Sequence, residues 1–597
     1  MLKRTHNCGE LRPDRVNQDV TLAGWVNALR SQGKGLIFVD LRDREGVTQV
    51  VFDMEDTSEA AQEAAARLRN EDVIAVQGVV RQRVAGPNPK LPTGEVEVVV
   101  REMEVLSKAD TPPFIPEEKG TDKEVREKVR LRYRYIDLRR PKMQNILRTR
   151  HNVTMSIRRY LDEAGFLEIE TPFLCRSTPE GARDFLVPSR VQPGNFYALP
   201  QSPQLFKQIL MVAGCDKYFQ IVRCFRDEDP RADRQAEFTQ LDMEMSFIER
   251  EDVMQLVEGL TKHIWKNVAG IELPDFPRMT YREALDRFGI DRPDLRFGME
   301  LVDISDLAGK TDFGVFTGAL AKENGVVKVI RVPGGASLSR KQTDALGKFA
   351  QEFGAGGLPT VKLTDDGFTT GVAKFLNDIA DPLIERTGMK TGDLLLFACD
   401  SYDVVTRVLG ELRNKLAEDL GLIDESMWAP VWVIDFPAFE WNEDENRWDS
   451  LHHPFTAPKP EDVQKLSTDP GNVLTNAYDL VMNGSEIAGG SIRIHRNEVQ
   501  KQVFSLLGLS EEQAREKFSF LLDALRYGAP PHGGIAFGLD RLVMLLCGTT
   551  NIRDVIAFPK TLNGMDLMTQ APAAVEKDQL AELHIELTTD PEPVPAD

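Results

Sequence analysis

Two neighbouring segments of the chain alternate charged and apolar residues, and their charged side chains could together bind a charged ligand. Residues 218–228 (YFQIVRCFRDE) alternate as a strand, one face of which carries Val222, Cys224, Arg226 and Glu228. After a turn, residues 238–245 (FTQLDMEM) have an apolar side and a polar side that carries Gln240, Asp242 and Glu244. Placing these charges on one face is unfavourable unless they meet ligands or one another, so we expect a ligand-binding hairpin. A surface hairpin with salt bridges is the alternative.

A second predicted hairpin carries two acidic side chains that could hold a metal ion. Residues 478–487 contain an Asn-Gly pair at 483–484, the strongest two-residue signal for a tight hairpin turn. With that turn, Val481 lies opposite Glu486, and Asp479 becomes a diagonal neighbour of Glu486 at ~7 Å. The chain has no Cys/His cluster, so the two carboxylates suit a hard cation such as Mg²⁺, shared between protein and phosphate groups.

Farther along the same strand, Arg493 can share the face of Glu486 only if the alternation is broken. Simple alternation sends the two side chains to opposite faces. Gly489 and Gly490 lie between them, and glycine accommodates the backbone of a β-bulge. We therefore predict a β-bulge at this glycine pair.

A glycine-rich segment near the C-terminal end could approach a phosphate closely. Residues 533–541 (GGIAFGLDR) read as a short apolar strand that leads into an apolar helix over 542–547. Backbone free of side chains, with Arg541 at the start of a helix, suits a nucleotide phosphate. Alone, this pattern is a weak signal.

Length and composition limit what kind of protein could position these residues. A chain of 597 residues is too long for one core and suggests about three to five domains. Its 42% hydrophobic and 28% charged residues are typical of a globular protein, and no run of about 18 apolar residues predicts a membrane span. The N-terminal residues lack the apolar stretch of a signal peptide. Six scattered cysteines without a C-x-x-C pair fit a reducing cytoplasm.

The net charge of −21 by itself disfavours a nucleic-acid partner, but the charge is unevenly distributed. Phosphate binding is local, because screening limits charge interactions to about 10 Å. Residues 126–159 contain twelve Lys or Arg and only two acids. This segment is either a solvated helical face or a hinge that contacts phosphates.

The first 106 residues have the pattern of a small barrel. Five strands are expected at 20–27, 36–42, 47–52, 73–83 and 96–106, with a helix at 58–69 after the third strand. That order is typical of an OB-fold, whose open face commonly binds single-stranded nucleic acid. Phe38 alternates with Asp40 and Arg42, so we place it on a polar, exposed strand face as a candidate platform for base stacking, and Gln49 could meet a base edge. As single residues, Phe38 and Gln49 fit ordinary barrel residues better, since a small barrel needs aromatic side chains in its core.

The remainder of the chain divides by composition into further segments. Proline-rich residues 108–118 are an expected linker, followed by a helix over 144–164 and by strands and hairpins over 167–247. The segment 297–424, which ends in a helix at 404–420, reads as an inserted α+β domain. We predict these domains: 1–106 (OB-fold), 107–140 (hinge), 141–296 and 425–570 (the two parts of a catalytic domain), 297–424 (insertion) and 571–597 (C-terminal extension, a partly ordered cap).

The three chemical segments together resemble the signature motifs of the class II aminoacyl-tRNA synthetases. Residues 165–172 (GFLEIETP) are similar to the first motif, residues 225–228 (FRDE) to the second and residues 538–541 (GLDR) to the third. The strings at 178–184, 201–207, 452–455 and 489–493 narrow the resemblance to the aspartyl branch, and the 297–424 segment resembles the extra domain of its bacterial type. The resemblance covers nearly the whole chain and implies an α+β multidomain protein with an antiparallel-sheet catalytic domain.

The resemblance implies a role for each matching position. The enzyme would activate L-aspartate with ATP and Mg²⁺, and would then transfer it to the 3′ end of tRNA(Asp). Arg226 and Arg541 would be the catalytic residues. Aspartate would be bound by Glu180, Ser202, Gln204, Lys207, Arg226, Asp242, His452, His453 and Arg493. ATP would be bound by Arg226, Asp227, Glu228, Gln235, Glu486, Gly538, Leu539, Asp540 and Arg541. Mg²⁺ would be bound by Asp479 and Glu486, and the anticodon by Arg30, Phe38 and Gln49. Pro172 would lie at the interface of a homodimer in the cytoplasm.

Some of these roles have alternatives. His452 and His453 could sense substrate charge or closure of a lid at 176–182, or could be satisfied structural histidines. A lysyl enzyme would need acids in place of Lys207 and Arg493, and an asparaginyl enzyme should lack the long insertion. A tRNA-binding paralogue without activity should have lost some of the phosphate and metal residues, which are all present. Whether tRNA(Asn) is also charged depends on residues near 32–34 and 87–90. The rigid segment Pro87-Asn-Pro-Lys90 favours the strict form.

Overall fold

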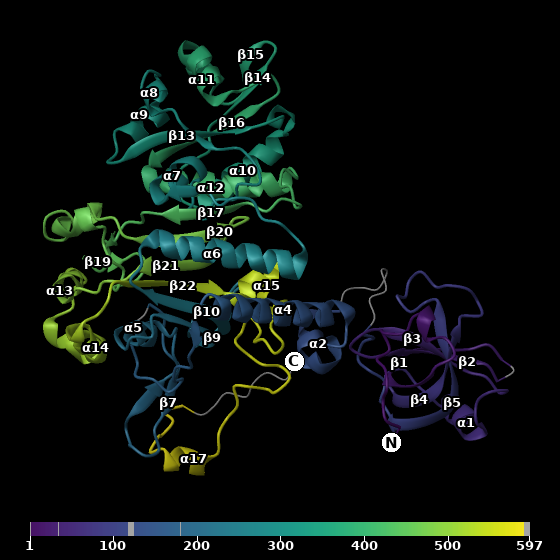
Figure 1. The fold of residues 1–597 in the computed structure, drawn as a ribbon. Helices are drawn as coiled ribbons and strands as arrows, with labels where there is room; N and C mark the ends of the chain where they lie inside the picture. Colours follow the sequence, from purple (N-terminus) through teal and green to yellow (C-terminus); the bar gives the residue numbers. More distant parts are fainter. Residues whose placement is uncertain (1, 34, 117–124, 179–180, 590–597) are drawn as a thin grey trace.

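The structure is a computed structural model that describes residues 2–33, 35–116, 125–178 and 181–589. Its strands form three large sheets and two short hairpins within that part of the chain. Figure 1 shows a barrel at the right of a central body, with a second sheet and its helices projecting from the top of that body.

The N-terminal sheet is a closed barrel with strand order β1-β2-β3-β5-β4. Its strands are β1 (Asp19–Ser31), β2 (Ile37–Arg42), β3 (Val47–Phe52), β4 (Val73–Gln82) and β5 (Val96–Ser107). The helix α1 (Glu59–Ala65) follows β3 and begins at Ser58, whose side chain accepts a hydrogen bond from Ala61 N. The five predicted strands and the helix between the third and fourth are therefore confirmed, although the helix ends before residue 69.

One detail of the predicted barrel face is wrong. Phe38 and Asp40 are partly exposed, but Arg42 on the same strand is buried, with 6% of its surface exposed. Its guanidinium donates two hydrogen bonds to the Glu71 carboxylate, at 2.9 and 2.8 Å. The polar face of β2 thus ends at Asp40, because Arg42 forms a buried ion pair instead of meeting solvent.

An eight-stranded sheet forms the centre of the body, in the order β11-β17-β20-β21-β22-β10-β9-β6. Neighbouring strands are antiparallel except for the two outermost pairs, β11 with β17 and β6 with β9. The strands are β6 (Leu167–Glu168), β9 (Lys217–Phe225), β10 (Glu237–Ser246), β11 (Arg278–Thr280), β17 (Pro430–Ile434), β20 (Ala477–Met482), β21 (Ser485–Ile492) and β22 (His532–Gly538). Both predicted hairpins are confirmed as antiparallel pairs within this sheet.

Three helices pack against this sheet and bury its apolar side chains. They are α4 (Pro141–Glu163), α6 (Arg250–Ile264) and α15 (Leu539–Cys547), which lie side by side across the sheet in Figure 1. Ile157, Val257 and Leu542, one from each helix, are fully buried in a single hydrophobic cluster with Leu241 and Ile535 of the sheet. The charged sides of the strands are therefore left for the opposite face.

A five-stranded sheet lies within the predicted insertion, in the order β12-β13-β16-β14-β15. Its strands are β12 (Leu301–Asp303), β13 (Gly325–Val332), β14 (Thr360–Thr364), β15 (Gly367–Thr369) and β16 (Leu394–Ser401). Helices on this sheet are α8 (Ser305–Ala308), α9 (Gly314–Leu320), α10 (Arg340–Glu352), α11 (Ala380–Thr387) and α12 (Tyr402–Asp419). Two hydrophobic clusters, one with α8, α9 and α11 and one with α10 and α12, show that both of its faces are covered.

The basic segment is mainly engaged in ion pairs within the protein. It contains α2 (Glu127–Arg132), α3 (Arg134–Asp137) and most of α4. Arg134 is buried, pairs with Asp137 at 2.5 Å and donates to the carbonyl oxygens of Arg553, Ile556 and Ala557. Arg139 pairs with Glu71 of the barrel at 2.7 Å, and Arg148 pairs with Glu45 at 3.4 Å. The segment thus joins the barrel to the body, as the predicted hinge would, but neither alternative from the sequence anticipated that its cations pair with acids of the protein.

Further α-helices and two short hairpins complete the described part of the chain. They are α5 (Gln204–Val212), α7 (Tyr281–Phe288), α13 (Asn497–Leu506), α14 (Glu511–Ala524), α16 (Ile552–Val555), α17 (Lys577–Glu582), and the hairpins β7 (Leu186–Pro188) with β8 (Phe196–Ala198) and β18 (Phe439–Asn442) with β19 (Arg447–Ser450). Among the described helices, none combines the length and the apolar character needed to cross a bilayer.

Candidate active site

Two adjoining cavities lie on the charged face of the eight-stranded sheet. The first has a volume of about 440 Å³ and is lined by residues of α5, β10, β20 and β21 and by the loop that carries His452 and His453. The second, of about 230 Å³, is lined by residues around the end of β9, β22 and the start of α15. Arg226 and Glu486 line both cavities, so the two spaces meet at these side chains.

The first cavity contains two buried cations held by buried acids. Lys207 of α5 is 1% exposed, and its Nζ lies 2.8 Å from Asp242 Oδ1 and 3.5 Å from Glu244 Oε2. Arg493 is 4% exposed, and its Nε and Nη2 donate to the two carboxylate oxygens of Glu244 at 3.0 and 3.2 Å. Asp242 Oδ2 has no hydrogen-bond partner among the described residues. The cations are thus positioned by the protein, and both line the cavity.

Glu244 remains ionised at the centre of this network. Complete burial would raise the pKa of its carboxyl, but the positive charges of Arg493 and Lys207 lower the pKa below its ordinary value. The carboxylate therefore stays charged and fixes both cations. Glu244 was placed on the polar face of its strand by the sequence, but it was not selected as a site residue.

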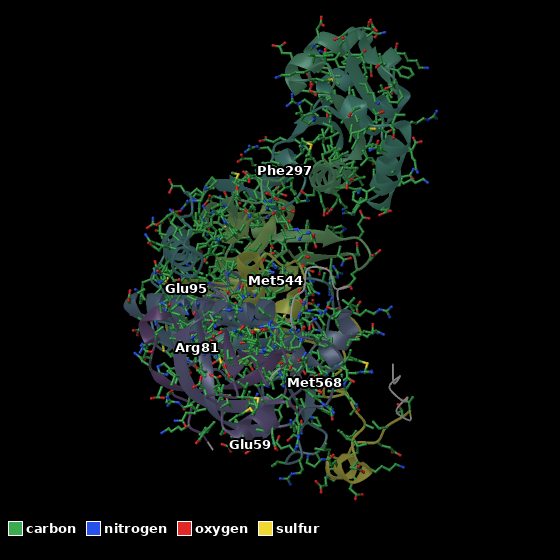
Figure 2. The ribbon with its side chains drawn as sticks, turned by 90° about the vertical axis from the view of Figure 1, so that its right-hand side faces the viewer. Glu59, Arg81, Glu95, Phe297, Met544 and Met568 are labelled. Atoms are coloured by element: carbon green, nitrogen blue, oxygen red, sulfur yellow. The ribbon has the colours of Figure 1, made fainter. Side chains whose placement is uncertain are left out.

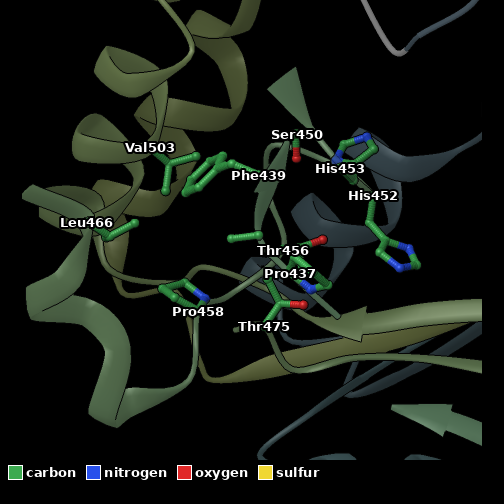
Figure 3. Close-up of a pocket in the computed structure, with 11 residues that line it drawn as sticks. Pro437, Phe439, Ser450, His452, His453, Thr456, Pro458, Leu466, Thr475 and Val503 are labelled. Atoms are coloured by element: carbon green, nitrogen blue, oxygen red, sulfur yellow. The ribbon is translucent and has the colours of Figure 1, made fainter. Parts of the chain in front are cut away.

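Two neutral histidines line the same cavity. Burial and the positive charge of Arg493 lower the pKa of His452 to about 4 and that of His453 to about 3. His453 Nδ1 accepts a hydrogen bond from Phe455 N, whereas its buried Nε2 has no partner among the described residues. Figure 3 shows both imidazoles on the opposite side of an adjacent small pocket from Val503 and Leu466. His453 therefore keeps one polar atom available for a ligand.

The second cavity combines arginines with an aromatic wall. The Arg226 guanidinium lies over the Phe238 ring, 5.2 Å from its centroid, and its buried Nε has no partner among the described residues. Arg541 donates from Nη1 to the carbonyl oxygen of Glu486. Phe238 was not selected from the sequence, although an aromatic residue at the start of a polar strand was a possible signal for a base-stacking wall.

The carboxylates of Asp479 and Glu486 converge on Gly489. A Cβ atom at this glycine would lie 2.8 Å from Asp479 Oδ1 and 3.3 Å from Glu486 Oε1. Asp479 is 8% exposed, and its Oδ1 has no hydrogen-bond partner among the described residues. Burial, followed by the negative charges of Glu486 and Asp291, raises the pKa of its carboxyl well above the ordinary value. No three His, Cys, Asp or Glu side chains of the described residues are close enough to hold a metal ion by themselves. The pair therefore fits an ion that takes its other ligands from phosphate and water.

The predicted β-bulge is present, but at a different residue. Leu480 pairs with Ala488 and Val481 with Glu486, so Ile487 is the extra residue and lies before the glycine pair. The alternation shifts by one residue at Ile487, and Arg493 joins the face of Glu486 as predicted. Glycine is needed at position 490 for a different reason: a Cβ there would lie 2.2 Å from the carbonyl oxygen of Gly534 on β22 and would clash with it.

The structure places most of the predicted aspartate and ATP residues in the lining of one of the two cavities. All described residues predicted to bind aspartate line the first cavity, namely Ser202, Gln204, Lys207, Arg226, Asp242, His452, His453 and Arg493. Six of the predicted ATP positions other than Arg226 line the second, namely Glu228, Gln235, Glu486, Gly538, Asp540 and Arg541. Glu180 lies outside the described residues.

Four of the predicted ATP positions either bind other groups of the protein or do not line a cavity. Asp540 is 2% exposed and accepts from Arg150 Nη1 at 2.5 Å and from Thr239 N at 2.7 Å. Gln235 Oε1 accepts from Lys560 N at 2.9 Å. Leu539 is buried in the core, and Asp227, whose Oδ2 is 3.8 Å from Arg183 Nε, does not line either cavity. The motif spacing alone could not tell which of these side chains face the cavity.

The three predicted anticodon residues meet on one face of the barrel. Arg30 is paired in register with Phe38, and Arg30 Nη2 donates to Asp40 Oδ1 at 2.9 Å and to Gln49 Oε1 at 3.3 Å. Gln49 is buried, and its Nε2 donates to Glu97 Oε2 at 2.8 Å. These polar groups form a connected surface beside a half-exposed aromatic ring.

Pro172 lies in an exposed apolar region beside the edge strand β6. Phe173 and Leu174 follow it and are 46% and 54% exposed. The next residue, Cys175, forms a β-bridge with Ala198, which places this segment beside the exposed Phe196 and Tyr197 of β8.

Comparisons with known proteins show what this chain is similar to. Residues 126–562 match the family model described as tRNA synthetases class II (D, K and N), and residues 20–106 match the OB-fold nucleic acid binding domain. An aspartate–tRNA ligase of Macrococcus caseolyticus is 54% identical over 98% of this chain and 99% of its own length. An aspartate–tRNA(Asp/Asn) ligase of Caldanaerobacter subterraneus subsp. tengcongensis is 53% identical over 98% of each chain.

Solved structures share the fold. The asparaginyl-tRNA synthetase of Pyrococcus horikoshii complexed with asparaginyl-adenylate has a TM-score of 0.59 at 20% identity, over 94% of this chain and 99% of its own. The aspartyl-tRNA synthetase of Entamoeba histolytica has a TM-score of 0.58 at 20% identity, over 94% of this chain and 91% of its own.

Proposed function

The chain belongs to the class II tRNA synthetases for aspartate, lysine and asparagine, and we infer that it is the bacterial-type aspartate–tRNA ligase. The observation that carries the assignment is the cavity in which Lys207 and Arg493 lie next to Arg226 and Glu486. Two cations suit an amino acid with an acidic side chain, and they disfavour lysine. The adjoining cavity suits the ATP that activates it.

We propose that activation proceeds by displacement at the α-phosphorus of ATP. A carboxylate oxygen of aspartate attacks this phosphorus, and the bond to the bridging oxygen breaks, which releases pyrophosphate and leaves aspartyl-adenylate. Arg226, at the junction of the cavities, would bind the α-phosphate, and Arg541 would bind the γ-phosphate. A Mg²⁺ ion bound by Asp479 and Glu486 would neutralise phosphate charge. Phe238 would stack on the adenine, and Glu228 would fix the nucleotide.

Selectivity for aspartate follows from the charge of the first cavity. Lys207 and Arg493 would bind the side-chain carboxylate of the substrate, while Glu244 and Asp242 hold them in place. Asparagine fits the same space, but its neutral amide offers the two cations no carboxylate to bind. Ser202, Gln204 and the two histidines would complete the pocket, and Glu180 would bind the α-ammonium group.

The second step transfers aspartate to tRNA. A hydroxyl oxygen of the terminal adenosine attacks the carbonyl carbon of aspartyl-adenylate, and AMP leaves. The barrel would read the anticodon through Arg30, Phe38 and Gln49. We propose the strict form, which charges tRNA(Asp) alone, because Asn88 accepts hydrogen bonds from Lys90 N and Leu91 N and so holds the 87–90 segment in one conformation. Lys34, in the other predicted segment, lies outside the described residues.

Aminoacylation of tRNA transcripts tests the function and the strict form together. We expect radiolabelled aspartate to be incorporated into a transcript with the aspartate anticodon. A transcript that differs only in carrying the asparagine anticodon should have a kcat/KM for charging that is roughly 100-fold lower. This ratio corresponds to a difference of about 2.7 kcal/mol in transition-state stabilisation. Equal charging of both would contradict the strict form alone, and no aspartylation of either would contradict the assigned function.

The active form would be a homodimer in the cytoplasm. Its interface would be the apolar region of Pro172, Phe173, Leu174, Phe196 and Tyr197, because an exposed edge strand beside apolar side chains favours pairing with a second copy. The six cysteines, all within the described residues, form no disulfide bond with one another, which suits a reducing compartment. Sedimentation of a Phe173→Asp variant, expected to be monomeric, tests the interface.

We also propose that the domain limits predicted from the sequence mark the functional units, with 297–424 as the insertion.

A further inference from the structure

The loop that leads from the body into the insertion lies against the hairpin of Asp479 and Glu486. It runs from the end of α7 to the start of β12, through residues 289–300. A Cβ atom at Gly484, in the turn of that hairpin, would lie only 3.0 Å from Asp294 Cβ of the loop. Figure 2 shows Phe297, farther along the loop, at the point where the body meets the insertion. The loop is thus in direct contact with the element that carries the carboxylate pair.

The insertion itself fixes the conformation of this loop. Arg413 of α12 is fully buried, and its Nη2 donates to the carbonyl oxygens of Asp294, Phe297 and Gly298 at 2.8, 2.8 and 2.9 Å. The same guanidinium lies over the Phe297 ring, 4.0 Å from its centroid. Within the loop, Arg296 pairs with Asp294 at 2.8 Å. A charged group that binds three carbonyl oxygens leaves the loop little freedom to move.

Asp291 of this loop faces the active site. It lines the first cavity together with Asp479, Glu486 and Gly489. Its side chain forms no ion pair with any residue that the structure describes. Its negative charge acts on Asp479, as does that of Glu486. Asp479 is more than nine-tenths buried, and its Oδ1 accepts no hydrogen bond from the described residues, so this oxygen is free to bind a cation.

We propose that Asp291 is a third carboxylate for the divalent ion, that it acts through a coordinated water molecule, and that the insertion positions it through Arg413. Direct coordination by all three acids does not fit, because no three such side chains of the described residues are close enough for one ion. An outer carboxylate orients the water ligands of a hydrated ion such as Mg²⁺ and adds to its electrostatic attraction. The insertion would therefore contribute to activation of aspartate, although it lies outside the eight-stranded sheet. This inference rests on the proposed Asp479–Glu486 metal site.

Binding of Mn²⁺ to the full-length protein in the presence of ATP, measured by electron paramagnetic resonance, tests the proposal. We expect Asp291→Asn to raise the dissociation constant for Mn²⁺ roughly tenfold, the size typical of lost outer-shell partners. Asp291→Glu should keep most of the affinity, because it retains a carboxylate. Arg413→Lys should weaken Mn²⁺ binding in the same direction, since a lysine cannot bind the three carbonyl oxygens in the same way. Asp366→Asn, an exposed acid of the insertion, is the matched control and should leave the affinity unchanged.

The outcomes separate this inference from the proposed function. If Glu486→Gln abolishes Mn²⁺ binding while Asp291→Asn binds like the wild type, the role of Asp291 is refuted and the Asp479–Glu486 site stands. If Glu486→Gln also binds like the wild type, the metal site itself is refuted. An Asp291→Asn variant with normal Mn²⁺ affinity but a raised KM for aspartate would assign Asp291 to the amino acid instead.

Discussion

The charge pattern around Lys207 and Arg493 explains how two cations remain buried and fixed before a substrate arrives. Each is paired with an acid from β10, Lys207 with Asp242 and Arg493 with Glu244. Burying charges is unfavourable unless geometry and hydrogen bonding compensate, and here Glu244 binds both cations. The substrate carboxylate then enters a site whose donors need little reorganisation.

Replacing the charge of Glu244 should impair aspartate binding. In Glu244→Gln, Arg493 loses its ionic partner, so we expect the KM for aspartate to rise roughly 10- to 100-fold, or about 1.4–2.7 kcal/mol, with a smaller change in the KM for ATP. ATP–pyrophosphate exchange at varied substrate concentrations measures both constants. Glu258→Gln is a matched control, because Glu258 accepts from Trp432 Nε1 outside the two cavities and should affect stability only. An unchanged KM for aspartate in Glu244→Gln would contradict the account.

His453 should make the stability of the protein depend on pH. Its folded pKa of about 3 lies below the ordinary value, so the unfolded chain binds the proton more readily. The stability from the neutral imidazole is complete above about pH 6.5 and is lost as the pH falls toward the folded pKa. Between pH 6.5 and 5, the free energy of unfolding should fall for this reason by at most about 2 kcal/mol.

Thermal melting at several pH values checks this expectation. The Tm of the wild type should fall more between pH 7 and pH 5 than the Tm of a His453→Gln variant. His151→Gln, which changes an exposed histidine of α4, should behave like the wild type. Parallel Tm curves for the wild type and His453→Gln would show that His453 is not a neutral buried group.

Among the elements, the β20–β21 hairpin determines which side chains face the cavity. The bulge at Ile487 places Arg493 on the face of Glu486, and Gly489 leaves room for both carboxylates. The sequence predicted the turn, the facing pairs and the need for a bulge. It could not locate the bulge, because the shift depends on how β20 and β22 pair with β21 and on the close approach of Gly490 to Gly534.

A methyl group at Gly489 should weaken metal binding with little effect on the fold. In Gly489→Ala the new Cβ would meet Asp479 Oδ1 and Glu486 Oε1, so the two carboxylates must move apart. We expect the Mg²⁺ concentration for half-maximal exchange to rise about tenfold, as for other changes in metal surroundings. Gly356→Ala, where a Cβ would meet no atom within 4 Å, is the control. The same Mg²⁺ requirement in both variants would argue against a metal site at this glycine.

Sequence patterns anticipated the regular elements better than the irregular ones. Alternation located the barrel strands and the polar side of β10, because side chains of a strand alternate regardless of the rest of the fold. It could not identify Asp291, which lies in a loop without periodicity, or show that Asp540 turns its carboxylate toward Arg150 and Thr239. Such details depend on contacts between segments that are hundreds of residues apart.

At the scale of the whole molecule, the basic segment connects the barrel to the body. Arg139 pairs with Glu71 and lies over the Trp25 ring of the barrel, 5.2 Å from its centroid. Arg150 and Arg134 bind groups of the body, including Asp540 and the carbonyl oxygens around α16. This explains why a strongly acidic protein concentrates basic residues here.

Loss of Arg139 should affect tRNA charging but not aspartate activation. In Arg139→Ala the barrel loses contacts that orient it, while Glu71 keeps its ion pair with Arg42. We expect ATP–pyrophosphate exchange to stay within about twofold of the wild type, while kcat/KM for tRNA charging falls roughly tenfold, or about 1.4 kcal/mol. Arg101→Ala, which removes an exposed pair with Asp19 within the barrel, should change neither rate. Equal losses in both reactions would show that Arg139 supports the active site instead.

The most direct test of the account is amino-acid-dependent ATP–pyrophosphate exchange by the purified protein without tRNA. The charges of Lys207 and Arg493 predict that aspartate supports exchange. Isosteric, neutral asparagine should do so roughly 10³-fold less efficiently, because its amide cannot replace the carboxylate that these two cations are placed to bind. Lysine should support none. Exchange driven equally well by asparagine, or by lysine, would show that this cavity does not select an acidic side chain and would contradict the account.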